Sequence, residues 1–307
     1  LDSDGVVDPA GTGISWSLDN GDTWNFIDQP TDSLPVCENL GCEEPLNPDN
    51  CECYPALTGC SWNNTTEVCS AGANILFEWN NTSLFSLAQL TKVKNVTYDL
   101  SIDFDNKYIY AASWGGMLRR FKYIDDNPSW EIVPLPMDNM STMGCSNEPY
   151  PSNFVYSPID PPVGSDNHKP FSVLVDSYND STYIWVGTAN GINRGTINGD
   201  CIDWYHQTVT NGLSGNWVVG IENQITNEFN RIWAITWSAG QGESNSISYT
   251  DNQGVYWQDV EYFTNQNIKI FNLIFDEYKI YVASENGLYY SEDAIHWEKV
   301  SSSWVDS

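Results

Sequence analysis

The segment Gly13–Gln29 (GISWSLDNGDTWNFIDQ) most narrows the folds open to this chain, because it encodes a complete strand–turn–strand unit by itself. Asp19 can accept hydrogen bonds from backbone N–H groups of its own turn, and Gly21 can adopt a positive φ at little steric cost. Trp24 then begins the outgoing strand, where an aromatic side chain can pack over the hairpin. The segment predicts a β-hairpin whose turn is stabilised locally.

Short strands recur in a fixed order from Tyr98 to the end of the chain. Each unit contains an aliphatic strand, an aromatic–aliphatic strand, a strand led by Gly and a strand led by Trp. The second strand is the clearest member of each unit: Lys107–Ser113, Tyr183–Thr188, Arg231–Thr236 and Lys279–Ser284. Four antiparallel strands repeated every roughly 40–50 residues indicate the blades of a propeller.

The repeats predict an all-β fold, a β-propeller of four-stranded antiparallel blades with a disulfide-rich insertion. In chain order we expect the outer half of a first blade at 1–30, a Cys-rich insertion and connector at 31–96, a blade at 97–135, a long loop insertion at 136–169, and blades at 170–210, 211–262 and 263–307. A ring must close to remove its edge strands, and the inner strands of the first blade would precede Leu1. We therefore expect four full blades and a half blade of a ring of roughly six to eight blades. Alternatively, the Cys-rich region and Ala73–Leu90 supply the missing strands.

The turn of the first hairpin carries a recognisable motif. Its residues Ser17, Asp19, Gly21, Thr23 and Trp24 fit S-x-D-x-G-x-T-W at every specified position. This segment resembles the Asp-box (BNR-type) repeat of β-propellers such as sialidases, sortilin-like receptors, xyloglucanases and photosystem assembly factors. The resemblance implies a propeller architecture and leaves the function open.

Two later segments resemble the same motif less closely. One is Tyr249–Trp257, in which Asp251, Gly254 and Trp257 match, with one extra residue between Asp and Trp. The other is Ser291–Trp297, in which Ser291, Asp293 and Trp297 match, with one residue fewer and no Gly. Both lie where a blade would join its third strand to its fourth.

A second resemblance covers the middle of the chain. Tyr183–Gly195 (YIWVGTANGINRG) and Asn211–Thr236 are similar to the repeats of two-component-regulator propellers, which form periplasmic sensor domains of bacterial hybrid kinases. This resemblance implies a secreted or surface-attached bacterial protein, and it adds an extracytoplasmic ligand-sensing propeller to the functions to be considered.

The cysteines predict disulfides in an oxidising compartment. Six of them lie in one Pro-, Asn- and Gly-rich stretch: Cys37, Cys42, Cys51, Cys53, Cys60 and Cys69. Their pairing is undetermined, and Cys145 and Cys201 are left as a further pair. A zinc site is disfavoured, because the stretch has no C-x-x-C pair and no nearby His. Together with several Asn-x-Ser/Thr sequons, Asn95 among them, the cysteines predict an extracellular or cell-surface glycoprotein.

The charge balance excludes some partners. Asp and Glu total 41 against 12 Lys and Arg, for a net charge of -29. Such a surface does not favour nucleic acid or anionic lipid, but it suits cationic partners. The sequence contains no run of about 18 apolar residues, so it predicts no membrane span. The start at Leu1 leads us to expect a mature or excised piece of a longer secreted protein.

A metal site is predicted only at the start of the chain. Asp2, Asp4 and Asp8 surround a Gly and could wrap Ca²⁺ in a short loop. The seven residues resemble the calcium loops of thrombospondin type 3 repeats. An acidic surface loop is the alternative, and no other cofactor is expected.

No catalytic residues are predicted. A sialidase needs three clustered arginines, and this chain has only Arg119, Arg120, Arg194 and Arg231. Trp114 and Trp237 follow second strands, where they could stack on sugars or grip a peptide. The sequence therefore favours a non-enzymatic interaction or structural module, with a protein, a polysaccharide or a second copy as partner. An extracellular glycoside hydrolase of the Asp-box propeller type is the alternative enzyme.

Overall fold

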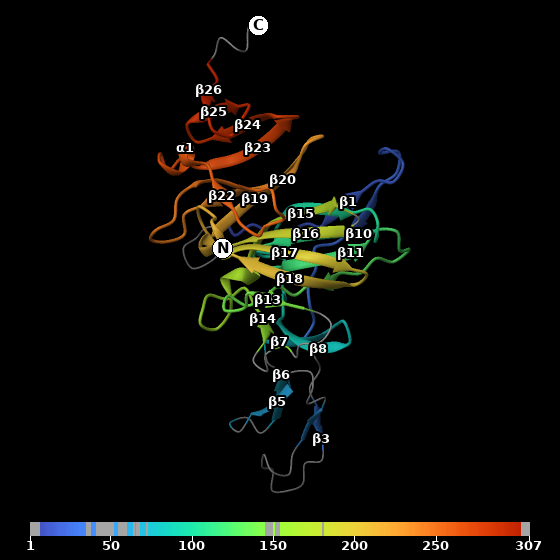
Figure 1. Cartoon of the computed structure of the whole chain (residues 1–307). Coiled ribbons are helices and arrows are strands. Elements are labelled where there is room, and N and C mark those ends of the chain that lie inside the picture. Colours follow the sequence, from blue (N-terminus) through green and yellow to red (C-terminus); the bar gives the residue numbers. More distant parts are fainter. Residues whose placement is uncertain are drawn as a thin grey trace.

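The computed structural model describes residues 7–34, 38–40, 52–54, 60–63, 65, 68–71, 73–144, 150, 154–179 and 181–301, with only the backbone for the short strands between 38 and 71. Its secondary structure is almost entirely β, as predicted (Figure 1). The one α-helix among the described residues, α1 (Glu261–Thr264), has four residues. No helix in the described ranges is long and apolar enough to span a membrane.

Four antiparallel sheets follow one another along the chain, and we name them blades A to D. Within each blade, the strands are hydrogen-bonded in chain order. Blade A contains β9 (Thr97–Asp103), β10 (Tyr108–Ser113), β11 (Met117–Lys122) and β12 (Glu131–Ile132). Blade B contains β15 (Pro170–Tyr178), β16 (Ser181–Thr188), β17 (Gly191–Asn198) and β18 (Cys201–Gln207). Blade C contains β19 (Trp217–Ile225), β20 (Asn230–Trp237), β21 (Ser246–Thr250) and β22 (Gln258–Asp259). Blade D contains β23 (Ile270–Asp276), β24 (Lys279–Ser284), β25 (Gly287–Ser291) and β26 (Glu298–Lys299).

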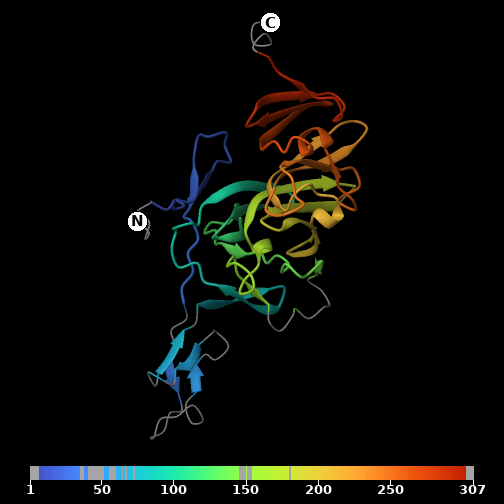
Figure 2. The ribbon, with the colours of Figure 1, turned by 90° about the vertical axis from the view of Figure 1, so that its left-hand side faces the viewer.

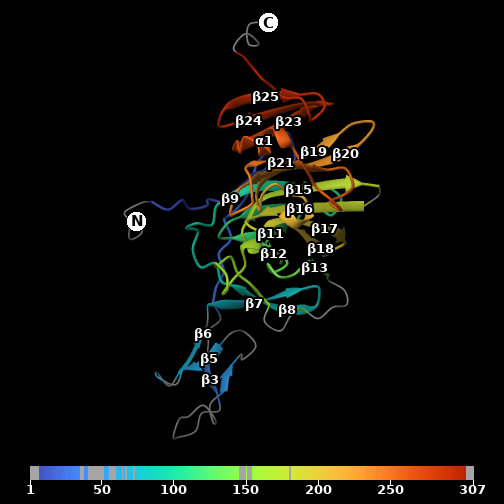
Figure 3. The same cartoon turned by 60° about the vertical axis from the view of Figure 1, so that its left-hand side comes forward.

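The apolar core lies in layers between consecutive blades. Because side chains alternate across a strand, neighbouring residues of one strand serve different layers. In β16, Ile184 and Val186 pack toward blade A, whereas Trp185 packs toward blade C. A further layer joins blade C to blade D. The first strands β9, β15, β19 and β23 contact one another in that order. The blades are thus stacked side by side with their first strands inward, as in a propeller (Figures 1 and 3).

The first hairpin lies on the face of blade A that is opposite blade B. It consists of β1 (Ile14–Trp16) and β2 (Asn25–Ile27) and stands apart from the other strands in Figure 2. Ile14 and Ile27 pack with Ile109, Ala111 and Phe121 of blade A. The hairpin therefore takes part of the place that a preceding blade would occupy.

The segment Ala73–Leu90 forms strands, but not for the first blade. Its hairpin β7 (Asn74–Trp79) and β8 (Thr82–Leu87) pairs with β14 (Val155–Tyr156) in a three-stranded sheet. Trp79 and Leu84 pack into the layer between blades A and B. The alternative in which Ala73–Leu90 completes the first blade is therefore wrong, because β1 pairs only with β2 among the described residues.

Short strands also form in the two predicted insertions, including the one expected to be a long loop. The insertion at 136–169 supplies β13 (Thr142–Met143) to the outer edge of blade B, as well as β14. In the Cys-rich region, β3 (Glu38–Leu40) pairs with β4 (Glu52–Tyr54), and β5 (Cys60–Asn63) pairs with β6 (Val68–Ala71). These strands lie at the end of the molecule opposite blade D (Figure 1).

The cysteine pairing stays a prediction. Cys201 is disulfide-bonded. Cys37, Cys42, Cys51 and Cys145 lie outside the described residues, and the backbone alone is described at Cys53, Cys60 and Cys69.

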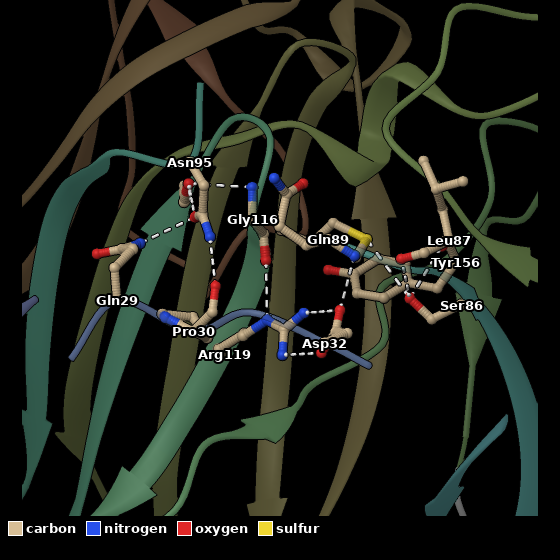
Figure 4. Close-up of polar contacts among 12 residues, drawn as sticks. Gln29, Pro30, Asp32, Ser86, Leu87, Gln89, Asn95, Gly116, Arg119 and Tyr156 are labelled. Atoms are coloured by element: carbon tan, nitrogen blue, oxygen red, sulfur yellow. Dashed lines mark hydrogen bonds and ion pairs between the residues drawn. The ribbon is translucent and has the colours of Figure 1, made fainter. Parts of the chain in front are cut away.

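A buried ion pair holds the chain where it leaves for the Cys-rich region and returns (Figure 4). The Arg119 guanidinium donates two hydrogen bonds to the Asp32 carboxylate, at 3.0 and 2.7 Å. Asp32 N–H also donates to Gln89 O, and Gln89 N–H donates to Asp32 Oδ2, both at 2.8 Å. Nearby, Asn95 is fully buried and donates to Pro30 O, so its sequon cannot accept a glycan in this fold.

Candidate functional site

A pocket of about 500 Å³ lies where second strands end and first strands begin. Corresponding positions of three consecutive blades line it: Trp114 after β10, Ala189 and Asn190 after β16, and Ala239 and Gly240 after β20. The residues that lead into β15 and β19 complete the lining: Asp160, Asp166, Lys169, Asn216 and Trp217, with Glu243 from the loop after β20. We call this site the loop-end pocket.

One side of the loop-end pocket is aromatic. The rings of Trp114 and Trp217 meet edge to face, with centroids 6.1 Å apart. Phe171 packs against both, at 5.1 and 5.8 Å. The predicted candidate Trp114 therefore belongs to an aromatic cluster that spans blades A, B and C.

The other side is rich in hydrogen-bond acceptors. The almost fully buried ammonium of Lys169 donates to Asp160 and to Asp166, the latter at 2.6 Å. Glu243 accepts hydrogen bonds from Ala239 N–H at 2.7 Å and from the Asn216 side chain at 2.9 Å. Three carboxylates and one ammonium thus line the pocket, which keeps a negative balance.

The insertion that carries Asp160 and Asp166 is held firmly. His168 is fully buried, accepts a hydrogen bond from Ser157 N–H at 3.0 Å and lies 3.1 Å from Leu135 O. Burial lowers the pKa of His168 to about 4, so the ring is neutral at pH 7. Asp138 accepts from Asp166 N–H and Asn167 N–H at 3.0 and 2.8 Å. These buried contacts fix one wall of the pocket.

The second predicted tryptophan, Trp237, does not line this pocket. Its indole N–H donates to Ile270 O at 2.8 Å, and its ring lies 6.1 Å from Phe271. The two candidates therefore lie on the same side of the blades without sharing a cavity. The sequence pattern did not single out Trp217 or Lys169. Trp217 begins the first strand of blade C, and that place is the signal that could have found it, whereas Lys169 meets its partners only through the path of the insertion at 136–169.

The turn of the first hairpin has the contacts expected from its sequence. Asp19 accepts hydrogen bonds from Thr23 N–H at 2.8 Å and from the Thr23 hydroxyl at 2.6 Å. Gly21 N–H donates to Ser17 Oγ at 2.7 Å, and Gly21 has a φ of 95°. Trp24, directly before β2, is exposed.

The second turn corrects the alignment of the motif. Thr250 takes the place of Ser17, because its hydroxyl accepts from Gly254 N–H at 3.0 Å. Asn252 takes the place of Asp19 and accepts from Tyr256 N–H at 3.1 Å. The expected extra residue is therefore absent. Asp251, which was assigned to the motif, forms an ion pair with Arg231 at 2.6 Å instead.

The third turn keeps the same polar residues in a shorter loop. Asp293 Oδ1 accepts from Ile295 N–H and His296 N–H, both at 2.8 Å. Ser291 Oγ accepts from Ala294 N–H at 3.0 Å, and Ala294 adopts the left-handed conformation, with a φ of 65°. Trp297 is buried between blades C and D. Trp257 of the second turn is buried between blades B and C.

The predicted calcium ligands are only partly described. Asp8 lies 3.4 Å from Lys94 Nζ, and Asp2 and Asp4 fall outside the described residues. In the described ranges, no group of three or more acidic, His or Cys side chains is arranged so that it could hold a metal ion. The calcium site stays a prediction.

A second hollow, a groove of about 740 Å³, lies between β19 and β23. Glu222 is one of its lining residues. Burial, and then the charge of Asp99, raises the pKa of Glu222, and burial also raises the pKa of Asp99. Asp99 accepts hydrogen bonds from Val173 N–H and Leu100 N–H at 2.9 and 2.8 Å.

The four arginines serve separate structural contacts. Arg119 binds Asp32, Arg120 binds Glu131 at 2.9 Å, and Arg231 binds Asp251. Arg194 donates to the backbone carbonyl of Gln253. Three guanidiniums are thus engaged within their own blade or with a neighbouring one, and that of Arg119 binds the chain that leads to the Cys-rich region.

Comparisons with known proteins concern the fold alone. No family model matches the chain, and no curated protein matches it in sequence. The extracellular domain of a hybrid two-component system from B. thetaiotaomicron is 12% identical, with a TM-score of 0.43, over 89% of this chain and 34% of that chain. An ancestral GH74 enzyme is 11% identical, with a TM-score of 0.31, over 94% of this chain and 38% of that one. YCF48 bound to a D1 peptide is 12% identical, with a TM-score of 0.33, over 68% and 69% of the two chains. This chain thus spans about a third of the length of the first of these structures, at 34%.

Proposed function

We propose that this protein is a secreted or cell-surface, non-enzymatic β-propeller module that binds a partner protein at the loop-end pocket. The observation that carries the proposal is the origin of the pocket. Corresponding loops of blades A, B and C and the insertion at 136–169 meet around one cavity. Loops on a rigid scaffold are where binding functions of proteins concentrate.

The chemistry of the pocket favours a cationic group. Trp114 and Trp217 line one side of it, and aromatic faces attract cations. The Lys169 ammonium already lies 5.3 Å from the centroid of the Trp114 ring, so a cation of the partner would add to this contact or turn to Trp217. Asp160 and Asp166 add acceptors that a Lys or Arg side chain of a partner could use. The net charge of -29 would attract a basic partner over a longer range and speed its association.

The rigidity of the site supports tight binding of a partner. The blades and the buried His168 hold the loops in place before any partner arrives. Binding to a preorganised site loses little conformational entropy, which improves affinity.

The test uses hexapeptides that differ only in carrying Arg, Lys, citrulline or Ala at one position, with binding measured by isothermal titration calorimetry. We expect the Arg and Lys peptides to bind, and Trp217→Ala and Asp160→Asn each to weaken binding at least tenfold, about 1.4 kcal/mol. Trp24→Ala is the matched control, because Trp24 is exposed and does not line the pocket. Equal binding of citrulline and Arg peptides would contradict the proposal. Binding to a glycan array that is lost in Trp217→Ala would instead indicate a polysaccharide as the partner.

A glycoside hydrolase is the second candidate function. The pKa values of Asp99 and Glu222 are both raised, and such shifts recur at catalytic carboxyl groups. Glu222 lines the groove between β19 and β23, which could receive a sugar chain. The measurement is the release of reducing ends from a panel of soluble polysaccharides. Release that Glu222→Gln abolishes would favour the enzyme over the binding module.

A further inference from the structure

One position toward the end of the first strand is polar in every blade. The residues are Asp103, Asp176, Gln224 and Asp276, which pair across to Tyr108, Tyr183, Arg231 and Lys279 of the second strands. Asp103, Asp176 and Gln224 are buried, whereas Asp276 is exposed. A buried carboxylate is unfavourable unless hydrogen bonds or an opposite charge compensate it. Asp103 and Asp176 therefore need stronger compensation than the other two residues.

Asp103 is compensated within its own turn. Its carboxylate accepts hydrogen bonds from Asp105 N–H at 3.0 Å, from Asn106 N–H at 2.9 Å and from the Asn106 side chain at 2.8 Å. The turn between β9 and β10 thus directs its N–H groups back at the end of β9. It supplies the partners that a buried carboxylate requires.

Asp176 has no partner of this kind. Its strand β15 continues to Tyr178, which pairs with Ser181 of β16, so the turn lies beyond the carboxylate. The donors to Asp176 are the side-chain amides of Asn223 at 3.2 Å and of Asn230 at 3.1 and 3.4 Å, both on blade C. In the part of the chain that the structure describes, no cationic side chain pairs with Asp176. Hydrogen bonds to a charged group are typically about 2.7–2.9 Å long, so these contacts compensate the charge only in part.

The amide of Asn230 also has an unused oxygen. Asn230 Oδ1 is buried and has no hydrogen-bond partner among the described residues. Rotation about the last side-chain bond exchanges Oδ1 and Nδ2, so the amide can present its oxygen to the Asp176 side without losing a hydrogen bond at Oδ1. Asn230 also lines a hollow of about 330 Å³, together with Ser177 and Tyr178 of β15. Solvent therefore reaches the residue next to Asp176, between the turns of blades B and C.

We propose that Asp176, Asn223 and Asn230 bind Ca²⁺ between blades B and C. Carboxylate and amide oxygens are ligands that Ca²⁺ prefers, and water from the hollow completes its coordination. The cation supplies the positive charge that no described side chain gives to Asp176, and the two amides turn their oxygens toward it. A site with one carboxylate should be weak, with a Kd of about 10⁻⁴–10⁻³ M, as in extracellular calcium modules.

This site is separate from the other sites of the molecule. It lies toward the ends of first strands, whereas the loop-end pocket lies where first strands begin, so it does not depend on the function proposed for that pocket. It is also distinct from the loop with Asp8, where the sequence alone predicts Ca²⁺. Because the cation joins blade B to blade C, its binding should stabilise the fold.

The first test is thermal unfolding of the protein after EDTA has removed bound metal and has been dialysed away. We expect replacement of KCl by about 10 mM CaCl₂, at constant ionic strength, to raise the melting temperature by about 2–4 °C. NMR of protein labelled with ¹⁵N in asparagine locates the ion. The side-chain amide signals of Asn223 and Asn230 should shift saturably with CaCl₂.

Matched variants identify the ligands. Asp176→Asn keeps the shape of the side chain and removes its charge, so it should weaken Ca²⁺ binding at least tenfold and abolish the rise in melting temperature. Asp103→Asn changes the equivalent carboxylate, which its own turn binds, and should keep the rise. Asp8→Asn changes the predicted loop at the start of the chain and should also keep the rise.

Asn230→Asp keeps the test decisive if Asp176→Asn does not fold. A second carboxylate beside Asp176 should bind Ca²⁺ at least tenfold more tightly, and it should lower the melting temperature only when the cation is absent. The proposal is overturned if CaCl₂ changes neither the melting temperature nor the signals of Asn223 and Asn230. It is also overturned if Asp8→Asn abolishes the effect and Asp176→Asn does not, or if CaCl₂ does not restore the stability of Asn230→Asp.

Discussion

The turns Ser17–Trp24 and Thr250–Trp257 have the same hydrogen-bond pattern and opposite surroundings. In each, a hydroxyl accepts from the Gly N–H, and an Asx oxygen accepts from the N–H before the Trp. Yet Trp24 is 66% exposed, whereas Trp257 is 0% exposed. The comparison shows that the turn is a local structure, and that the neighbouring blade decides what its tryptophan contributes to stability.

The neighbours of Trp257 explain the difference. Its ring meets Trp185 of blade B edge to face, with centroids 5.9 Å apart, and its indole N–H donates to Gln207 Oε1 at 2.6 Å. A Cβ added at Gly254 would lie 2.8 Å from the Gln207 amide, whereas one added at Gly21 would meet only Trp24, at 3.9 Å. The second turn is therefore part of the layer between blades B and C.

The largest expected effect is that of removing the buried tryptophan. Trp257→Ala leaves a cavity between Trp185 and Gln207 and removes the donor to Gln207 Oε1, so we expect a loss of about 3–5 kcal/mol in the free energy of unfolding. Urea unfolding followed by circular dichroism measures it. A loss below about 1 kcal/mol would show that blades B and C do not depend on this contact.

The paired glycine variants come next. Both glycines have positive φ, so Ala at either position costs about 1–2 kcal/mol in backbone strain. Gly254→Ala should cost about 1 kcal/mol more than Gly21→Ala, because its Cβ also displaces a hydrogen-bonded Gln207. Thermal unfolding of the two variants side by side gives the difference, and equal losses would contradict the role of blade B.

The two turns should also differ in their response to acid. Hydrogen bonds from the Thr23 hydroxyl, Thr23 N–H and Ser17 lower the pKa of Asp19 to about 2, whereas Asn252 does not titrate. The folded-state pKa of Asp19 lies below its ordinary value of 3.8. The stabilisation that the ionised Asp19 gives the folded protein is therefore complete above pH 3.8 and is lost as the pH falls through about 2. The amide shifts of Thr23 and Tyr256, measured by NMR from about pH 5 downward, report on each turn. We expect only the amide shift of Thr23 to change with pH. A midpoint of that change near pH 4 would mean that the hydrogen bonds to Asp19 are not formed.

The smallest expected effect is that of Trp24→Ala. The exposed ring contacts little, so the free energy of unfolding should change by no more than about 0.5 kcal/mol. The same chemical unfolding experiment used for Trp257→Ala measures it. A loss comparable to that of Trp257→Ala would show that Trp24 is covered in solution.

The candidate site was only partly predictable. Trp114 could be selected because it follows a second strand, and strand ends of one kind meet on one side of a propeller. Lys169 and Asp160 could not be selected, because their meeting depends on the path of the insertion at 136–169. The predicted register of the second turn is wrong for a related reason: Asn252 holds the place expected for Asp251, and Asp251 is engaged by Arg231 on the neighbouring strand.

The strands and the first turn could be predicted from the sequence alone, because interactions between residues close in the chain form them. The alternation of apolar residues specified the strands, and Asp19 and Gly21 specified a turn that closes on its own backbone. The tertiary structure decided which of the equivalent apolar residues are buried. Leu100 and Val173 hold the same register position in their blades, but among the described residues Val173 has a blade in front of it and Leu100 has none. Burial removes water from a surface, so it depends on a neighbour that no local pattern encodes.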